Sequence, residues 1–366
     1  MADSQAIVYY VTSHGFGHLN RAAAVVAALP RQTRVVVKTH QNQFAAWRQS
    51  AARPCELIEG VFDCGTVHPP GESSLVDRLA SLDAYERIHT AAAARLEAEV
   101  DFLRRGRFDA VVSDIAPLPL RAARSAGIPG ILVANFTWQQ IYEPYARRLS
   151  ARHRPMVREM EQEYREASLV LQAQPSLALE GFDRVRDVGL VARRGRPRGA
   201  ELRAALGIPR STRLVYMYVG RYGQHDMDWT NLARLGGYHF VSYHAAGEAR
   251  PNWHVLDPAA WPARDLAASV DVMVAKAGYG TATDAMIHRT PLVFPPRTGF
   301  AEHRVLAASL VRWGGGVPIS TRDFKQLNLS RSLARATALR PPRPPWPSDG
   351  ARRCADAIAR CTHRAR

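Results

Sequence analysis

The feature that most constrains this chain is an alternation between short apolar runs and helical segments, which occurs twice. Strands that alternate with helices form parallel βαβ units, in which helices cover both faces of a sheet. The strand-like runs of the first half lie at residues 6–12, 33–39, 108–114 and 128–135. The helical segments between them lie at residues 19–29, 75–104 and 118–126. The first half therefore predicts a doubly wound α/β domain.

The second half repeats the pattern after an interruption rich in glycine, proline and arginine. Its strand-like runs lie at residues 213–220, 238–244, 252–256, 270–276 and 290–296. A proline-rich stretch then precedes a last helical segment. We predict two Rossmann-like domains, at residues 1–175 and 210–345, joined by a linker at 176–209. The helix at 350–366 is expected to pack back on the first domain.

Composition bounds the class of protein. With 366 residues, 46% of them hydrophobic, the chain can bury two cores. No apolar run approaches the ~20 residues that span a bilayer, and the N-terminus lacks the features of a secretory signal. The cysteines fit neither a CxxC pairing nor a zinc spacing, which indicates reduced thiols; they are Cys55, Cys64, Cys354 and Cys361. We expect a cytoplasmic protein without a membrane span.

The formal net charge is +16, and arginine dominates it. Such a charge can attract nucleic acid, anionic lipid or a phosphorylated small molecule, or can keep a chain soluble. No basic stripe interleaved with aromatic residues, zinc finger or RNP-like motif accompanies it, so composition does not favour a nucleic-acid partner. The sequence carries no indication of oligomeric state.

A glycine-rich loop, SHGFGHLN at residues 13–20, follows the first predicted strand. Open α/β sheets bind ligands beyond the carboxyl ends of their strands, and helix N-termini favour anions. Gly15 and Gly17 form a G-x-G step, but Asn20 occupies the third glycine position of a dinucleotide fingerprint. The second strand runs into Lys38 instead of a ribose-binding acid, so a NAD site is not favoured.

Two histidines and an acid stand near the ends of predicted strands. His14 and His18 have the four-residue spacing of some metal sites, but no carboxylate or cysteine lies near them in sequence, and no metal is predicted. Asp114 ends a buried strand and can simply cap the next helix. If Asp114 instead lies beside a histidine of the first loop, the pair forms a good general base near neutral pH.

The second half carries a related feature, AKAGYGTATDA at residues 275–285, where a strand ends and a helix begins. Flexible, hydroxyl-bearing and charged residues combine there, namely Gly278, Gly280, Thr281 and Lys276. Such a set forms a phosphate cradle, with Asp284 one turn further on within reach of ribose. The alternative is an ordinary glycine turn. After the next strand, Glu302 can bind sugar hydroxyls and Arg297 can balance phosphate, or both can be solvated loop charges.

Several stretches together resemble a known family. They are VTSHGFGHLNRA, SDIAPLPLRAARSAGI, NFTWQQIYEPY and KAGYGTATDAMIHRTPLVFPPRTGFAEHRVL, and they cover most of residues 7–310. The chain resembles two-domain glycosyltransferases of the GT-B type, most closely the glycosyltransferase-like N-terminal domain of L-arabinokinases. The resemblance implies two Rossmann-like domains that face each other across a cleft. No kinase domain follows, so we expect a stand-alone hexosyltransferase.

A more distant resemblance, to UDP-glycosyltransferases, implies roles for the second domain. Residues 276–284 align with the donor box of that family. Lys276 stands at the phosphate-binding histidine, Asp284 at the ribose-binding glutamate, and Glu302 where the family contacts sugar hydroxyls. Between them Gly278 keeps a glycine, while Tyr279, Gly280 and Thr281 replace tryptophan, asparagine and serine. Arg221 is expected near the pyrophosphate, and the backbone of Val255 and Leu256 near the base.

The same resemblance implies the chemistry of the first domain. His18 matches the general base, Asp114 matches its supporting aspartate, and His14 is a rival base. We expect an inverting transfer without metal or cofactor, from a nucleoside-diphosphate sugar, in first place a UDP-sugar, to a small acceptor. A nucleoside or a natural product of secondary metabolism fits that description. The expected acceptor contacts are Gly15, Phe16, Gly17, Trp138 and Tyr142, from variable loops that include residues 41–50, 64–74 and 137–145.

Two alternatives share the fold. A sugar-nucleotide epimerase acts without an acceptor and needs several carboxylates around the sugar, for which the sequence offers Glu302, Asp226 and Asp228. A non-catalytic sugar-nucleotide-binding protein is expected if the fold persists without a working base.

Overall fold

The computed structural model describes residues 5–70, 75–219, 227–245 and 250–364. It forms two compact units. The first unit comprises Met1–Val67, Val76–Ala192 and Trp346–Arg366, and the second comprises His68–Leu75 and Arg193–Pro345. Each unit contains one sheet, and every strand pairing in both sheets is parallel.

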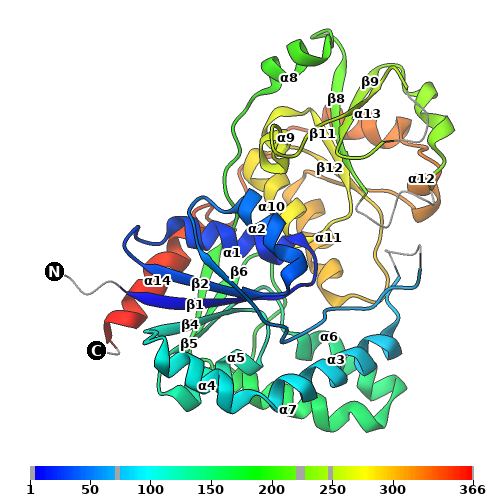
Figure 1. Ribbon diagram of the computed structural model, residues 1–366. Coiled ribbons are helices and arrows are strands. Elements are labelled where there is room, and N and C mark those ends of the chain that lie inside the picture. Colours follow the sequence, from blue (N-terminus) through cyan, green and yellow to red (C-terminus); the bar gives the residue numbers. More distant parts are fainter. Residues whose placement is uncertain (1–4, 71–74, 220–226, 246–249, 365–366) are drawn as a thin grey trace. The chain divides into compact units, whose positions relative to one another are not determined.

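In the described residues of the first unit, the sheet has seven strands in the order β3-β2-β1-β4-β5-β6-β7 (Figure 1). Their bounds are β1 (Ala6–Val11), β2 (Arg34–Thr39), β3 (Glu56–Glu59), β4 (Ala110–Asp114), β5 (Gly130–Ala134), β6 (Leu169–Ala173) and β7 (Val185–Gly189). The first six have the order 3-2-1-4-5-6 of a Rossmann fold, which confirms the predicted fold class. The chain order reverses between β1 and β4, where ligands bind in such sheets.

The stretch predicted as a linker, residues 176–209, holds two regular elements instead. β7 completes the first sheet, and α8 (Gly199–Leu206) belongs to the second unit, so the first unit continues to Ala192. β7 lies at an edge of its sheet, and its first three residues are exposed. An edge strand of this kind carries no continuous apolar run, and its sequence therefore resembles a loop.

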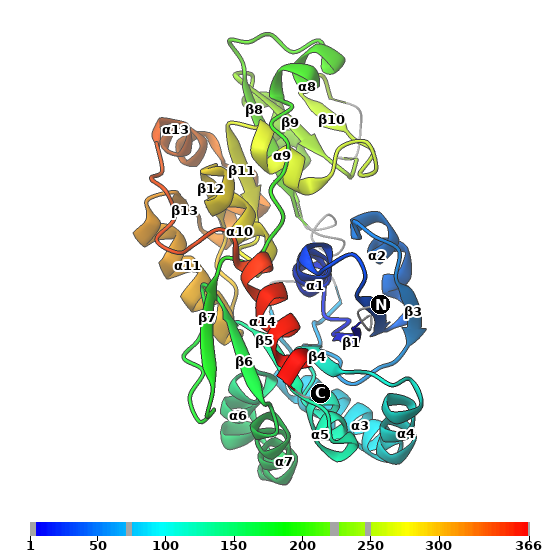
Figure 2. The same cartoon turned by 90° about the vertical axis from the view of Figure 1, so that its left-hand side faces the viewer.

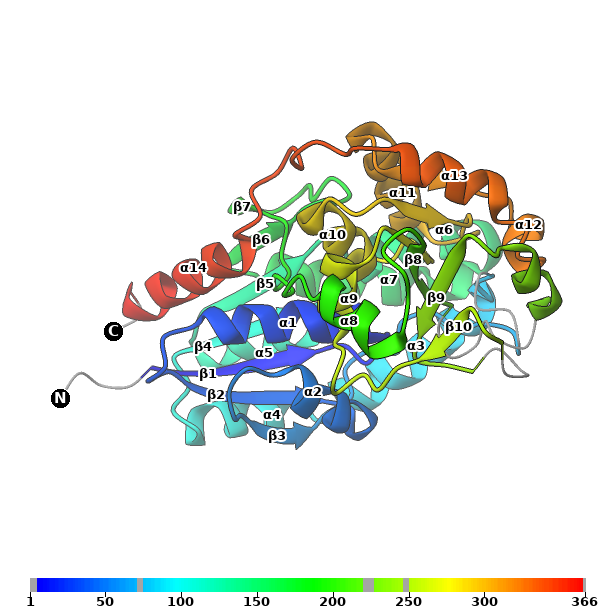
Figure 3. The same ribbon diagram turned by 90° about the horizontal axis from the view of Figure 1, so that it is seen from above.

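Helices cover both faces of the first sheet. On one face α1 (Phe16–Ala28) packs beside α14 (Gly350–Arg364), which also contacts β4 and β7 (Figures 2 and 3). On the other face α5 (Leu118–Ala126) packs against β4 and β5 and is flanked by α4 (Leu96–Arg105) and α7 (Arg154–Arg165). The remaining helices are α2 (Phe44–Ser50), α3 (Arg78–Ala93) and α6 (Trp138–Leu149), with 3-10 turns η1 (Gln41–Gln43) and η2 (Ala151–His153). The segment predicted at 75–104 is thus two helices.

Over the described part of the second unit, the sheet has six strands in the order β10-β9-β8-β11-β12-β13, again a Rossmann order. The strands are β8 (Arg213–Tyr218), β9 (Tyr238–Ser242), β10 (Trp253–Val255), β11 (Val272–Ala275), β12 (Leu292–Phe294) and β13 (Gly316–Pro318). Around them lie α9 (Ala263–Ser269), α10 (Tyr279–His288), α11 (Ala301–Trp313), α12 (Thr321–Lys325), α13 (Ser330–Ala338) and the 3-10 helix η3 (Trp229–Arg234).

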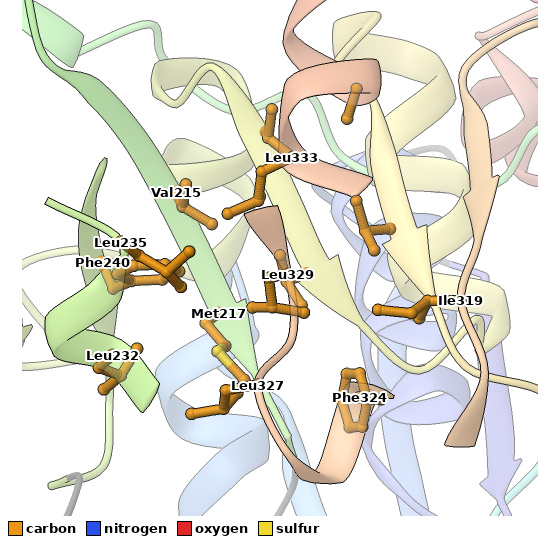
Figure 4. Close-up of a cluster of buried hydrophobic side chains, with 14 of the residues drawn as sticks. Val215, Met217, Leu232, Leu235, Phe240, Ile319, Phe324, Leu327, Leu329 and Leu333 are labelled. Atoms are coloured by element: carbon orange, nitrogen blue, oxygen red, sulfur yellow. The ribbon is translucent and has the colours of Figure 1, made fainter. Parts of the chain in front are cut away.

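The core of the second unit forms where α13, η3 and α12 meet one face of this sheet (Figure 4). Val215 and Met217 project from β8 toward Leu329 and Leu333 around α13, and all four side chains are fully buried. This packing fixes the central strands β8 and β11, whose carboxyl ends carry the predicted donor site. Within the described ranges, no helix is both long and apolar enough to cross a membrane.

Candidate functional site

The predicted catalytic pair of the first unit comes together at the topological switch point. Gly15 has φ +75° and turns the chain from β1 into α1, so His18 lies in the first turn of that helix. Asp114 is the last residue of β4, which pairs with β1. The His18 Nδ1 lies 2.7 Å from Asp114 Oδ1, and both side chains are buried, at 9% and 0% exposure.

A third buried residue, Arg21, joins this pair from the same helix. Its Nε donates to Asp114 Oδ2 over 2.7 Å and its Nη2 to Asp114 Oδ1 over 2.6 Å, while its Nη1 donates to the Asn135 side chain. Burial alone would raise the pKa of Asp114, but the charge and hydrogen bonds of Arg21, followed by the His18 bond, hold it below its ordinary value. Asp114 is therefore ionised at neutral pH.

The ionised carboxylate determines which nitrogen of His18 carries the proton. A contact of 2.7 Å to a carboxylate oxygen requires a hydrogen between the two atoms, and that hydrogen belongs to Nδ1. In the neutral ring Nε2 then holds the lone pair. The arrangement is that of a histidine oriented by a carboxylate to act as a general base.

His14 lies close to His18 but has a different environment. Its Nδ1 accepts a hydrogen bond from the Thr66 amide at 3.3 Å, so its ring proton lies on Nε2 in the neutral form. Gly65 approaches so closely that a Cβ there would meet the His14 ring at 2.0 Å. The ring of Trp138 packs edge-on against it at 5.2 Å. His14 is held by the backbone after β3 and by an aromatic ring.

A further buried acid, Asp63, organises this loop and was not predicted from the sequence. Its two oxygens accept hydrogen bonds from the Thr12 hydroxyl and from the Trp138 Nε1, and Thr12 in turn accepts from the His14 amide. Burial raises the pKa of Asp63 to about 6, against the lowering effect of these bonds. In sequence it stands in a loop, without a neighbouring apolar strand to mark it as buried.

Two residues expected to bind the acceptor are buried in the core of the first unit. Trp138 and Tyr142 are fully buried and stack on each other, with ring centroids 5.6 Å apart. Their polar atoms are engaged by Asp63 and by the Gly65 carbonyl. Residues 138–145 form part of α6, so the segment predicted as a loop is helical, and both rings are buried in the core. By contrast Phe16 is 51% exposed at the start of α1, where Gly15 is also exposed and Gly17 half-buried.

The predicted phosphate cradle of the second unit lies where the sheet order reverses. β11 ends at Ala275, and α10 begins at Tyr279 after an N-cap at Gly278. No side chain caps this helix start, so its first amides point outward from the turn. Thr281 and Gly280 lie in the first turn and Lys276 just before it, and all three are half-buried.

Asp284 projects from the second turn of α10. Burial raises its pKa to about 7, and the charge of Arg264 only partly offsets this. Among the described residues, none forms a hydrogen bond or ion pair with its carboxylate. A shielded carboxylate without such a contact is suited to accept hydrogen bonds from a ligand hydroxyl.

The other residues predicted to bind the donor differ in how exposed they are. The Val255 side chain is 56% exposed, whereas Leu256 is buried and its amide already donates to the Ser242 carbonyl, so only other backbone atoms there can contact a base. Glu302 is buried in the first turn of α11. Arg221 and Asp226 lie outside the described residues.

A histidine from a distant part of the chain, His68, lies beside Arg297. The segment His68–Leu75 belongs to the second unit, where Leu75 pairs with Thr298. His68 Nε2 lies 3.5 Å from the Arg297 guanidinium. Burial, and then the charges of Arg297 and Lys276, lower the pKa of His68. The sequence contains no signal for this, because the contact joins residues 229 positions apart.

Among the residues that the structure describes, two groups of acidic and histidine side chains have metal-like spacing, namely Asp83, Glu86 and His153, and His89, Glu159 and Glu163. Arginines already neutralise both groups: Arg152 pairs with the first and Arg121 with the second. Neither group includes a predicted site residue, and ion pairing between helices accounts for both.

Together the two Rossmann-like units have the GT-B fold of glycosyltransferases, as the sequence predicted. A solved structure of the glycosyltransferase of kitacinnamycin matches with a TM-score of 0.64 and 18% identity, covering 99% of this chain and 98% of that chain. A spinosyn rhamnosyltransferase complexed with thymidine diphosphate matches with a TM-score of 0.63 and 13% identity, covering 98% and 96%. At these identities the likeness establishes the fold.

In sequence the chain is similar to L-arabinokinase of Arabidopsis thaliana. The two are 33% identical over 342 residues, which is 91% of this chain and 32% of that protein. The chain thus spans about a third of the length of this curated relative. No family model matches the chain.

Proposed function

We propose that this protein is an inverting glycosyltransferase that moves a sugar from a nucleoside-diphosphate sugar to a hydroxyl of a small acceptor. The observation that carries the proposal is the His18–Asp114 hydrogen bond at the switch point of the first sheet. It leaves the His18 Nε2 as the basic nitrogen. The GT-B fold and the similarity to an L-arabinokinase support the same function.

In this mechanism His18 Nε2 takes the proton of the acceptor hydroxyl while the oxygen attacks the anomeric carbon. The bond from that carbon to the diphosphate breaks, and the nucleoside diphosphate leaves with the electron pair. A single displacement of this kind inverts the anomeric centre. Asp114 stabilises the imidazolium that forms. His18 is preferred over His14 as the base, because His14 Nδ1 is engaged by a backbone amide and not by a carboxylate. The exposed Phe16 offers an apolar contact for the acceptor.

The second unit would hold the donor. The first amides of α10 and the charge of Lys276 would stabilise the departing diphosphate, so the reaction needs no metal or cofactor. The Asp284 carboxylate would accept hydrogen bonds from ribose, and Glu302 from the sugar. A UDP-sugar is the proposed donor in first place, as the resemblance to UDP-glycosyltransferases implies. A ribonucleotide suits Asp284, because both ribose hydroxyls can bind one carboxylate, whereas the deoxyribose of a dTDP-sugar offers only one. The proposed acceptor is a nucleoside or a natural product. The proposed location is the cytoplasm, in keeping with the free cysteines.

A binding screen tests the donor half. Purified protein would be examined by thermal shift with UDP-, dTDP-, GDP- and ADP-sugars, together with Asp284→Ala and with Asp257→Ala, an exposed acid that only caps its own turn. We expect one sugar nucleotide to stabilise the wild type and the Asp257 variant but not the Asp284 variant. No stabilisation of the wild type by any of them would contradict the proposal.

A turnover experiment tests the base. Once the donor is identified, His18→Ala should still bind it. This variant should lose both sugar transfer to an acceptor and the slow hydrolysis of the donor by water, whereas His14→Ala should retain measurable turnover. Donor binding by a wild type that neither transfers nor hydrolyses the sugar would favour a non-catalytic binding protein. Of the carboxylates that an epimerase would use, Asp228 caps η3 and binds Thr230, and Asp226 lies outside the described residues.

A further inference from the structure

A cavity of about 790 Å³ lies at the edge of the first sheet where its strands begin. The segments that lead into β5, β6 and β7 form it together with the last turns of α14. The Gln5 side chain, just before β1, donates to the Ala359 carbonyl and so ties α14 to this edge (Figures 1 and 3). His18 and Asp114 lie at the opposite edge, about 15 Å or more away, because the strands between have about five residues. The cavity is therefore separate from the proposed catalytic pair.

The charged side chains around this cavity are mostly basic. Four arginines and one carboxylate line it, and all five residues are exposed to solvent. They are Arg124, Arg184, Arg186, Arg360 and Asp183. Because the arginines come from α5, β7 and α14, they surround one cavity and do not form a stripe along one element. Such an arrangement attracts a compact anion.

These arginines lack the carboxylate partners that exposed arginines elsewhere in the unit have. Within the described part of the chain, Arg184, Arg186 and Arg360 form no ion pair, and Arg124 lies 3.6 Å from a glutamate. Arg165 of α7, by contrast, pairs with a glutamate one turn before it. The positive charge at the cavity is therefore left largely uncompensated by the protein.

Helix ends account for only part of this charge. The C-terminus of a helix carries a partial negative charge that cations stabilise. Arg124 lies in the last turn of α5 and Arg360 near the end of α14, so each has such a partner. Arg184 directly precedes β7 and Arg186 lies within it, and a strand end carries no comparable charge. The two arginines of β7 are two residues apart, so their side chains leave the same face of the strand.

The chemistry of the lining defines a class of ligand. A guanidinium group binds phosphate through paired N–H donors. Apolar side chains, among them Ile128, Leu169 and Val185, also line the cavity and can contact an organic group. Its volume falls in the range of about 300–1,000 Å³ that is usual for small-molecule sites. We propose that this arginine cavity binds a small organic phosphate with several negative charges, of the size of a nucleotide. This second site does not depend on the proposed transferase function.

The test is isothermal titration calorimetry with ATP at low ionic strength, because ATP combines several phosphates with an organic group and carries no sugar for transfer. The double variant Arg184→Gln/Arg186→Gln should bind ATP at least about tenfold more weakly, since it loses two charged donors. Arg331→Gln/Arg335→Gln is the matched control: it removes two exposed arginines of α13 and should stay within about twofold of wild type. Asp183→Asn should instead bind ATP more tightly, because it removes the carboxylate that repels the phosphates.

Alkylation of Cys361, a half-buried thiol that lines the cavity, locates the bound ATP. ATP should slow the reaction of iodoacetamide with Cys361 but not with Cys55, the half-buried thiol before β3, as measured by peptide mass spectrometry. Asp284→Ala should bind ATP in this cavity as the wild type does, so a failed sugar-nucleotide screen and a failure here are distinguishable.

Three results would overturn the proposal. The first is a wild type that does not bind ATP, and the second is a variant of the two β7 arginines that binds it unchanged. The third is protection of Cys361 by single-stranded DNA but not by ATP, which would identify a nucleic-acid partner instead of a small organic phosphate.

Discussion

The pH dependence of donor binding offers the sharpest test of the second unit. Asp284 is a half-buried carboxylate whose pKa burial raises to about 7. Ribose hydroxyls donate hydrogen bonds, so the ionised form is the one that binds. Taking the pKa as about 7, roughly a tenth of Asp284 is ionised at pH 6 and nine tenths at pH 8. The dissociation constant of a sugar nucleotide should therefore be about tenfold larger at pH 6 than at pH 8.

The assay is isothermal titration calorimetry with an intact sugar nucleotide, whose diphosphate has no group that titrates between these pH values. Asp284→Asn is the control, because it keeps the shape but cannot ionise, and its weaker binding should not change with pH. His68 and His303 have lowered pKa values, mainly through burial, and any protonation they gain at pH 6 would strengthen anion binding. A wild-type affinity that is flat, or that improves as the pH falls, would refute the assignment of Asp284 to ribose.

Three further predictions concern stability. The pKa of Asp63 is about 6 in the folded protein against an ordinary 3.8, so the stability that this group contributes below pH 3.8 is lost as the pH rises through 6, by about 3 kcal/mol. Urea unfolding should show this loss of stability in the wild type but not in Asp63→Asn, and parallel pH profiles of the two proteins would contradict the prediction. Gly195→Ala should cost about 1–3 kcal/mol in thermal unfolding, because its Cβ would lie 1.9 Å from the Arg264 carbonyl oxygen, whereas Gly236→Ala has nothing within 4 Å and should be nearly neutral. Phe240→Ala should destabilise the second unit by about 3–5 kcal/mol, measured by denaturant unfolding, and a loss below about 1 kcal/mol would mean that the core of that unit relaxes around the cavity.

The sequence determined the architecture because burial on both faces of a parallel sheet leaves a local record. Central strands such as β4 and β8 contain short runs of buried apolar residues, and strands were predicted at those positions. The edge strands β3 and β7 leave no such record, since charged residues interrupt both of them. For the same reason the domain boundary was placed before β7 instead of after it.

The sequence also determined His18 and Asp114, because His18 belongs to the glycine-rich loop after the first predicted strand and Asp114 ends another strand. Arg21 could not be predicted as their partner, since an arginine on an amphipathic helix ordinarily faces solvent. Its burial depends on α14, which covers α1 although it lies more than three hundred residues away in the chain. Only the strand order, with β1 beside β4, brings residues 18, 21 and 114 together.

Tertiary structure alone decided which side chains face a ligand. Trp138 and Tyr142 look like ring-stacking residues in sequence, but the packing of α6 buries both in the core, where Trp138 packs against His14. Asp63 and His68 reach the two candidate sites through long-range contacts of loops. The physical reason is that strand periodicity is a local property, whereas the burial of a polar side chain depends on neighbours that the fold supplies from elsewhere in the chain.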